Sequence, residues 1–367
     1  MRLVQILAVA LFLVACVTMN ALAFHDGGVA ECAGCHTMHN SQDGAPIDAD
    51  HPAGNPYLLK FANSTDMCLS CHADYGQFYS GEGYGPGGDF YWVTKTWEWS
   101  AHGHANASTG DSHGHNVISP AGGISADATL SMAPGGDFDS DYLTCTSCHD
   151  PHGNQNFRIL YGSAIGPVYD GGRYNFTEEA PIAEGNSRRT YVGSGGEETH
   201  TQHTIYKSGM SEWCANCHET FHAGNTTNFV HPTGEDMGTA ASSTYNAYIS
   251  SDEPTGGNAS TAYNGLVPFE AVNVVFDDVD PGDYTQGPTS ADQVMCVTCH
   301  RAHATPFADI GRWDFGTTFI AESHPLATDT GASTEDVANK YYQYTFSTNQ
   351  RSLCNKCHVK DAGDAPL

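Results

Sequence analysis

The chain has 367 residues and a formal net charge of −28, because 42 aspartates and glutamates face only 14 lysines and arginines. A field of this sign repels phosphate backbones, so nucleic acid is excluded as a partner, and contacts between copies should depend on ionic strength. Length alone would suggest two domains.

The N-terminal stretch is typical of a secretory signal. Arg2 precedes an apolar run from Leu3 to Val17, and Ala21-Leu22-Ala23 forms a small-residue exit. This pattern predicts a signal peptide at residues 1–23, too short and wrongly flanked to span a membrane.

A lipoprotein signal is the alternative for the same stretch. Leu13-Val14-Ala15-Cys16 fits a lipoprotein cleavage box, which would leave a lipidated Cys16. Either signal exports the chain, and no later segment is long and apolar enough for a membrane helix. We expect residues 24–367 to form one domain, located outside the cell or at its surface, or alternatively in the periplasm.

A five-residue unit, Cys-x-x-Cys-His, occurs six times in the chain. The units comprise Cys32, Cys35 and His36; Cys68, Cys71 and His72; Cys145, Cys148 and His149; Cys214, Cys217 and His218; Cys296, Cys299 and His300; and Cys354, Cys357 and His358. In a c-type haem site the two thiols bond covalently to the porphyrin, and the adjacent imidazole becomes the proximal iron ligand. The pattern predicts six covalently bound haem c groups.

Zinc ribbons and disulfides are the competing explanations for these cysteines. Zinc would need thiols grouped in fours and would not require a histidine after every second cysteine. Of the 13 cysteines only Cys16 lies outside the units, so a disulfide would sacrifice a haem site.

The composition predicts the fold class of a multihaem cytochrome c. The 40 glycines and 17 prolines are spread along the chain, and few windows keep helical periodicity for three turns. We expect mostly coil, short helices at the Cys-x-x-Cys-His units, little strand, and a core of stacked haems, whose apolar faces replace side chains.

Two loop features accompany this fold. The sequence Pro-Gly-Gly-Asp-Phe occurs at 86–90 and at 134–138, which predicts matching loops, and we assign them no chemistry. The segments Gly185–His203 and Gly238–Gly265 are rich in Gly, Ser, Thr and Asn and are predicted to be surface loops.

The sixth ligand of each iron decides the function. An open position permits substrate binding, whereas a second strong ligand leaves electron transfer as the main activity. Six of the 20 histidines are proximal, so 14 remain to fill six distal positions. Methionine is an alternative ligand, but the supply of histidine makes it unnecessary.

Four histidines closely follow a haem unit and are predicted to be distal ligands: His39, His152, His222 and His303. Residues three or four apart on a short helix share a face, so such an imidazole lies beside its own haem and can reach a neighbouring iron. The alternative is that they are ordinary surface histidines.

His115 and His231 are the other two predicted distal ligands, with His25 in reserve. His115 lies in a cluster with His102, His104 and His113, which could equally be a solvated loop or an adventitious metal site. We expect the remaining histidines to be non-ligands: His51, His200, His203 and His324.

Six segments of the sequence resemble those of a known family. The segments FHDGGVAECAGCHTMHNS, PGGDFYWVTKTWEW, CTSCHDPHG, GMSEWCANCH, CHRAHA and LCNKCH are similar to those of the OmcS-type extracellular hexahaem cytochromes, which polymerise into filaments. The similarity runs from Phe24 almost to the C-terminus and keeps the order of the six haem units. It also favours cleavage after Ala23.

The resemblance implies bis-histidine ligation at every haem, a mostly coil fold and an unbranched filament. It also implies that His39 ligates, in the neighbouring subunit, the haem bound by His300. Such a head-to-tail contact does not close and therefore generates an open polymer.

The sequence favours the first of three candidate functions, with the second as the alternative, and we expect the protein not to be an enzyme. The first is a filament subunit that conducts electrons from outer-membrane donor cytochromes to extracellular oxidants such as metal oxides. The second is a monomeric periplasmic or surface electron carrier, and the third is a multihaem oxidoreductase. An enzyme of the third kind needs a five-coordinate haem, often signalled by a departure from Cys-x-x-Cys-His, and all six units are intact.

Overall fold

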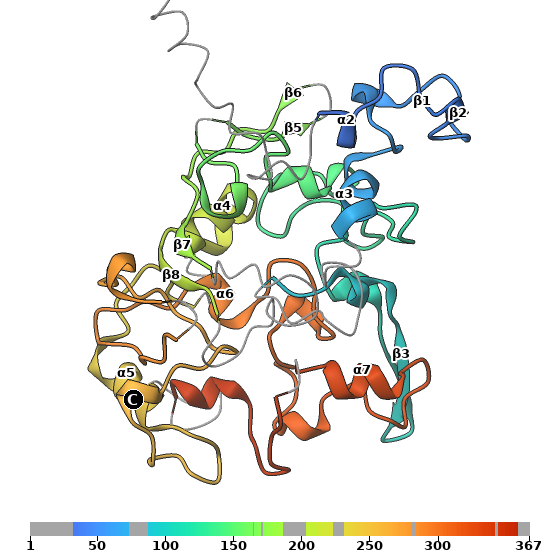
Figure 1. The fold of residues 1–367 in the computed structure, drawn as a ribbon. Coiled ribbons are helices and arrows are strands. Elements are labelled where there is room, and N and C mark those ends of the chain that lie inside the picture. Colours follow the sequence, from blue (N-terminus) through green and yellow to red (C-terminus); the bar gives the residue numbers. More distant parts are fainter. Residues whose placement is uncertain are drawn as a thin grey trace, which may run out of the picture.

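The computed structural model describes residues 32–72, 87–163, 165–169, 172–185, 203–222, 231–280, 283–341 and 344–358. These residues are mostly irregular, with short helices and small sheets, so the predicted coil-rich fold is confirmed (Figure 1). The predicted signal peptide, Cys16, His25 and His200 lie outside the described residues.

The helices are short. The α-helices are α2 (Cys32–Cys35), α3 (Ser64–His72), α4 (Met210–His222), α5 (Gly238–Ala247), α6 (Cys296–Cys299) and α7 (Thr334–Asn339). The 3-10 helices are η1 (Pro56–Leu58), η3 (Phe90–Thr94), η4 (Gly110–Ser112), η5 (Ser140–Tyr142), η6 (Cys145–Ser147), η7 (Phe157–Ile159), η8 (Ala259–Thr261), η9 (Phe276–Asp278), η10 (Ala308–Ile310), η11 (Ile320–Glu322) and η12 (Leu353–Lys356).

All strands pair in two-stranded antiparallel sheets within the described part of the chain. The pairs are β1 (Ser41–Gln42) with β2 (Ala45–Pro46), β3 (Trp97–Ala101) with β4 (His104–Ser108), β5 (Val168–Tyr169) with β6 (Gly172–Arg173), and β7 (Ile182–Glu184) with β8 (Ile205–Ser208). The β3–β4 hairpin turns at His102 and Gly103, whose φ angles of 51° and 79° suit a two-residue hairpin turn.

The first cysteine of every haem unit lies in a short helix, as predicted. For units one to six these helices are α2, α3, η6, α4, α6 and η12 in that order. In unit one the amide of His36 donates to the carbonyl of Cys32 over 2.9 Å, and the amide of His300 makes the same bond to Cys296 over 3.1 Å in unit five. A single helical turn is enough to place two cysteines three residues apart on one side.

The C-terminal half has a side-chain core that composition did not predict. Tyr245, Leu266, Phe269 and Trp313 are almost fully buried there and belong to one apolar cluster. The prediction of a surface loop over 238–265 is therefore wrong, because α5 begins at Gly238 and directs Tyr245 into this cluster.

The N-terminal lobe projects from the molecule. Figure 1 shows α2, β1 and β2 at one corner, with α3 joining them to the remainder and α5 and α7 toward the opposite end. Haem unit one therefore lies at an extremity.

Candidate haem-binding sites

Thiols of consecutive units lie next to each other. The Cys68 thiol of unit two hydrogen-bonds to Cys145 of unit three, which raises the pKa of Cys68 and lowers that of Cys145. A hydrogen bond between Cys214 and Cys296 does the same for units four and five, with the raised pKa on Cys214.

The remaining neighbours are also close enough to interact. Burial, followed by the charges of Cys68 and Cys71, raises the pKa of Cys35. Burial and then the charges of Cys354 and Cys357 raise the pKa of Cys299.

Units three and four are linked in the same way. Burial and then the charge of Cys148 raise the pKa of Cys217. The six units therefore follow one another in space in their order along the chain.

The structure pairs proximal imidazoles with histidines from distant segments. The rings of His36 and His152 are stacked with their centroids 6.3 Å apart and their planes 5° apart. His149 faces His303 with the same centroid separation of 6.3 Å and an interplanar angle of 65°.

Two more pairs have the same separation. His218 of unit four lies 6.0 Å from His115, and His358 of unit six lies 6.1 Å from His231, both between ring centroids. The sequence predicted these residues as ligands but did not show which of them meet.

These separations fit one iron between each pair. Two imidazole nitrogens that bind a metal from opposite sides at about 2 Å each hold their ring centroids roughly 6 Å apart. Stacked rings in direct contact would lie closer, and the ring of His324 lies only 3.7 Å from Trp99. The paired imidazoles therefore leave the space that an iron with two axial ligands needs.

Burial favours the neutral form of the His115 and His303 imidazoles. Burial lowers the pKa of His115 to about 4 and that of His303 to about 3. His115 Nδ1 lies 2.7 Å from the Ala302 carbonyl, so the ring proton is held on Nδ1. The Nε2 lone pair is then available to a metal.

Four proximal histidines have the same arrangement. Their Nδ1 atoms donate to backbone carbonyls, namely His36 to Tyr57 over 2.9 Å, His149 to Arg158 over 2.9 Å, His218 to Pro134 over 2.8 Å and His300 to Asp309 over 2.7 Å. Such outer bonds fix the orientation of a ligating imidazole and raise its basicity.

The repeated Pro-Gly-Gly-Asp-Phe loops have a role that the sequence analysis missed. Gly88 accepts from His303 Nδ1 over 3.3 Å, and Pro134 accepts from His218. A Cβ added to Gly136 would lie 1.8 Å from the Cys217 carbonyl, so only glycine permits this approach. The repeated sequence indicated this role, because each copy of the loop provides a backbone carbonyl to a predicted ligand histidine.

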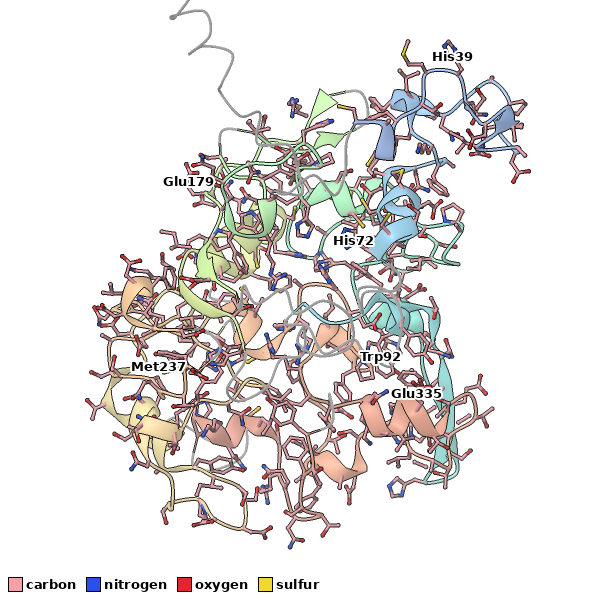
Figure 2. All side chains as sticks on the ribbon, viewed as in Figure 1. His39, His72, Trp92, Glu179, Met237 and Glu335 are labelled. Carbon is pink, nitrogen blue, oxygen red and sulfur yellow. The ribbon has the colours of Figure 1, made fainter. Side chains whose placement is uncertain are left out.

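Four predicted ligands lie outside the four pairs, namely His39, His72, His300 and His222. His39 is exposed at the outer edge of the N-terminal lobe (Figure 2). His72 ends α3, where burial lowers its pKa. His300 has its ring 5.4 Å from Phe315, which is 41% exposed.

His222 is not brought to a proximal histidine in any described ring contact. Its Nε2 lies 3.8 Å from Glu212, and its Nδ1 lies 3.3 Å from the Thr233 hydroxyl. The spacing explains this position, because His222 follows its unit by four residues, whereas His152 and His303 follow theirs by three.

The histidines expected to be non-ligands bond to protein groups where they are described. His51 pairs with Asp48 at 2.9 Å, His203 lies between the Thr204 and Tyr284 carbonyls, and His324 pairs with Asp329 at 2.6 Å. His113 is fully buried against Trp97, whereas His102 and His104 are exposed.

The twelve described cysteines form no disulfide with one another. No three His, Cys, Asp or Glu side chains among the described residues converge to hold a metal ion. The same residues contain no helix long and apolar enough to cross a membrane.

Comparison with known proteins gives one consistent result, although no family model matches the chain. The chain is 35% identical to the C-type cytochrome OmcS of Geobacter sulfurreducens, over 93% of its own length and 95% of that protein. Two solved structures superpose with a TM-score of 0.78 at 32% identity, covering 92% of this chain and all of theirs. They are the OmcS nanowires and the outer membrane cytochrome S filament of the same organism. The chain therefore belongs to the OmcS family of c-type cytochromes.

Proposed function

We propose that this chain is an extracellular electron-transfer protein that polymerises into a filament and carries six covalently bound haem c groups. The observation that carries the proposal is the set of four imidazole pairs with centroids 6.0 to 6.3 Å apart, at haem units one, three, four and six. The relatives named above support the filament, since both solved structures are filaments.

The chain's own residues provide attachment and ligation. In each unit the two cysteines would anchor a haem, and the following histidine would bind its iron. A second histidine would bind the same iron, which would leave no position for a substrate. Haem so held supplies one-electron redox chemistry, and two imidazole ligands with acidic surroundings favour a low reduction potential.

The distal histidines of the odd units follow a rule. His152 follows unit three and faces the histidine of unit one, and His303 follows unit five and faces that of unit three. Each reaches two units back. His39 follows unit one, so two units back is unit five of the preceding copy, where His300 is proximal.

We propose on this basis that His39 ligates the His300 haem of the preceding subunit. The exposure of His39 at the edge of the projecting lobe agrees with this role. Each copy would complete a site of the preceding copy, which makes assembly and haem ligation interdependent.

A second rule applies to the even units. His115 precedes unit three and faces the histidine of unit four, and His231 precedes unit five and faces that of unit six. His25 precedes unit one, so the rule assigns it to unit two, where His72 is proximal. His25 lies outside the described residues, and its assignment rests on sequence order alone. It replaces His222 in the proposed ligand set.

In the proposed role the protein receives electrons from outer-membrane cytochromes. It passes them to extracellular oxidants such as metal oxides.

Electron microscopy of the secreted haem fraction tests the proposed filament. Wild-type protein should form filaments, and His39→Ala protein should remain as single particles with one high-spin haem. Single particles from the wild type would indicate a monomeric carrier instead. A high-spin haem in the wild-type filament would indicate an enzyme.

A further inference from the structure

The three odd haem units share a strained turn. Two consecutive non-glycine residues adopt left-handed backbone conformations beside each unit, and we call each pair the left-handed turn. The pairs are Tyr57 and Leu58 (φ 55° and 59°), Arg158 and Ile159 (49° and 54°), and Asp309 and Ile310 (57° and 55°). Left-handed backbone is unfavourable for L-residues and is unusual for β-branched isoleucine.

Each left-handed turn makes the same two hydrogen bonds to its haem unit. At unit three, the Arg158 carbonyl accepts from His149 Nδ1 over 2.9 Å, and the Ile159 carbonyl accepts from the Asp150 amide over 2.8 Å. The corresponding pairs of bonds measure 2.9 and 2.7 Å at unit one, and 2.7 and 2.9 Å at unit five.

The left-handed conformation explains how the two adjacent carbonyls both face the same haem unit. In an extended strand successive carbonyls point to opposite sides, whereas helical conformations of either hand point them the same way. Two left-handed residues therefore present adjacent oxygens, one to the imidazole and one to the backbone beyond it.

The side chains do not explain why this turn occurs three times in the chain. Tyrosine, arginine and aspartate share no chemistry, yet Tyr57, Arg158 and Asp309 occupy the same position. At unit four the acceptor is Pro134, and the residue with positive φ that follows is Gly135, which pays no such cost. A strained conformation built three times around one kind of ligand indicates a function for the backbone itself.

We propose that the left-handed turns are positioning elements that fix the proximal imidazoles of the odd units, hold their protons on Nδ1 and lower the reduction potentials of those haems. A carbonyl accepting from Nδ1 makes the imidazole a stronger donor to iron and so stabilises the oxidised form. This inference rests on the proposed ligation by His149 but not on filament formation.

Unit three offers the cleanest test, because both of its proposed ligands, His149 and His303, belong to one copy. Arg158→Pro fixes φ near −65° and removes the turn. Arg158→Asn is the matched control, since asparagine tolerates left-handed backbone while removing the charge that acts on His303. Redox titration and electron paramagnetic resonance of the holoprotein give the readouts.

In Arg158→Pro one of the six haems should have a higher potential than the same haem in Arg158→Asn and a changed low-spin signal, while Arg158→Asn should keep the wild-type low-spin signal. If Arg158→Pro does not accumulate as holoprotein, Arg158→Val, which left-handed backbone disfavours, should give a smaller shift of the same sign. An unchanged titration in the proline or valine variant, or an equal shift in Arg158→Asn, would overturn the proposal. His149→Ala tests the ligation separately, because six low-spin haems in that variant would contradict the proposed function itself.

Discussion

The rings of His36 and His152 lie parallel, with 6.3 Å between their centroids and 5° between their planes. One belongs to the first haem unit and the other follows the third, so a single site joins two distant parts of the chain. The same kind of link recurs between His149 and His303. Removing one distal histidine should therefore disturb one haem and leave the others ligated.

His152→Ala is expected to convert one of the six haems from low spin to high spin, because the site of His36 loses its second imidazole. Magnetic circular dichroism of the ferric protein measures this change. His51→Ala is the control, since His51 bonds to Asp48 at the surface and should leave the spectrum unchanged. Six low-spin haems in His152→Ala would refute the pairing.

His25 and His222 are rival ligands for the haem of unit two. His25→Ala should produce one high-spin haem, because the order of the even units assigns His25 to His72. His222→Ala should keep all haems low spin, because the His222 ring bonds to Thr233. The opposite result would restore His222 as the ligand. Magnetic circular dichroism of the two ferric variants distinguishes these outcomes and does not require an assembly assay.

The contribution of Glu270 to stability should fall as the pH rises through the window between its unfolded and folded pKa values. Burial raises the pKa of this carboxyl from 4.5 to about 7, while its oxygen accepts from the Met210 amide at the start of α4. Between these values the folded chain retains a proton that the unfolded chain has lost, so increasing pH favours unfolding by up to about 3 kcal/mol.

Urea unfolding at pH values from about 5 to 8 measures this effect as the difference between the wild type and Glu270→Gln, in which the contribution of Glu270 to the slope should be absent. Asp89, whose pKa burial also raises to about 7, contributes a slope of the same sign, so the double variant with Asp89→Asn should differ further from the wild type. A slope in Glu270→Gln equal to that of the wild type would contradict the assignment.

Tyr245 tests the side-chain core of the C-terminal half. Its hydroxyl donates to the Val267 carbonyl over 2.7 Å and accepts from the Asn264 amide over 3.0 Å, with no exposed surface. Tyr245→Phe should lower the free energy of unfolding by about 1–3 kcal/mol, because two buried backbone groups lose their partner. Tyr57→Phe, at a side chain that is 70% exposed, should change it by less than about 0.5 kcal/mol.

The sequence was sufficient for what depends on local chemistry. The spacing of Cys32, Cys35 and His36 is set by covalent haem attachment, and this spacing alone predicts a helical turn at each unit. Scattered glycine and proline likewise predict the coil between units. No long-range contact is needed for either conclusion.

The pairing of each proximal histidine with its distal histidine depends on long-range contacts, so it could not be predicted from the residues alone. Nothing near His36 in sequence indicates that His152 faces it, and a spacing of four instead of three is the only local sign that sets His222 apart. The core around Tyr245 was missed because a stretch rich in Gly, Ser and Asn suggests a loop, although its aromatic residues pack together once α5 forms. The left-handed turns were invisible because Tyr57, Arg158 and Asp309 have no side-chain feature in common.

We expect two imidazoles to hold each of the six irons, and we expect one imidazole of the His300 haem to come from another copy of the chain. A cryo-electron microscopy map of the secreted wild-type protein, at a resolution that shows side chains, tests both expectations most directly. We predict a filament in which His39 of each subunit reaches the haem bound by His300 of the preceding one. Isolated particles, or a haem at His300 without a second imidazole, would contradict the account.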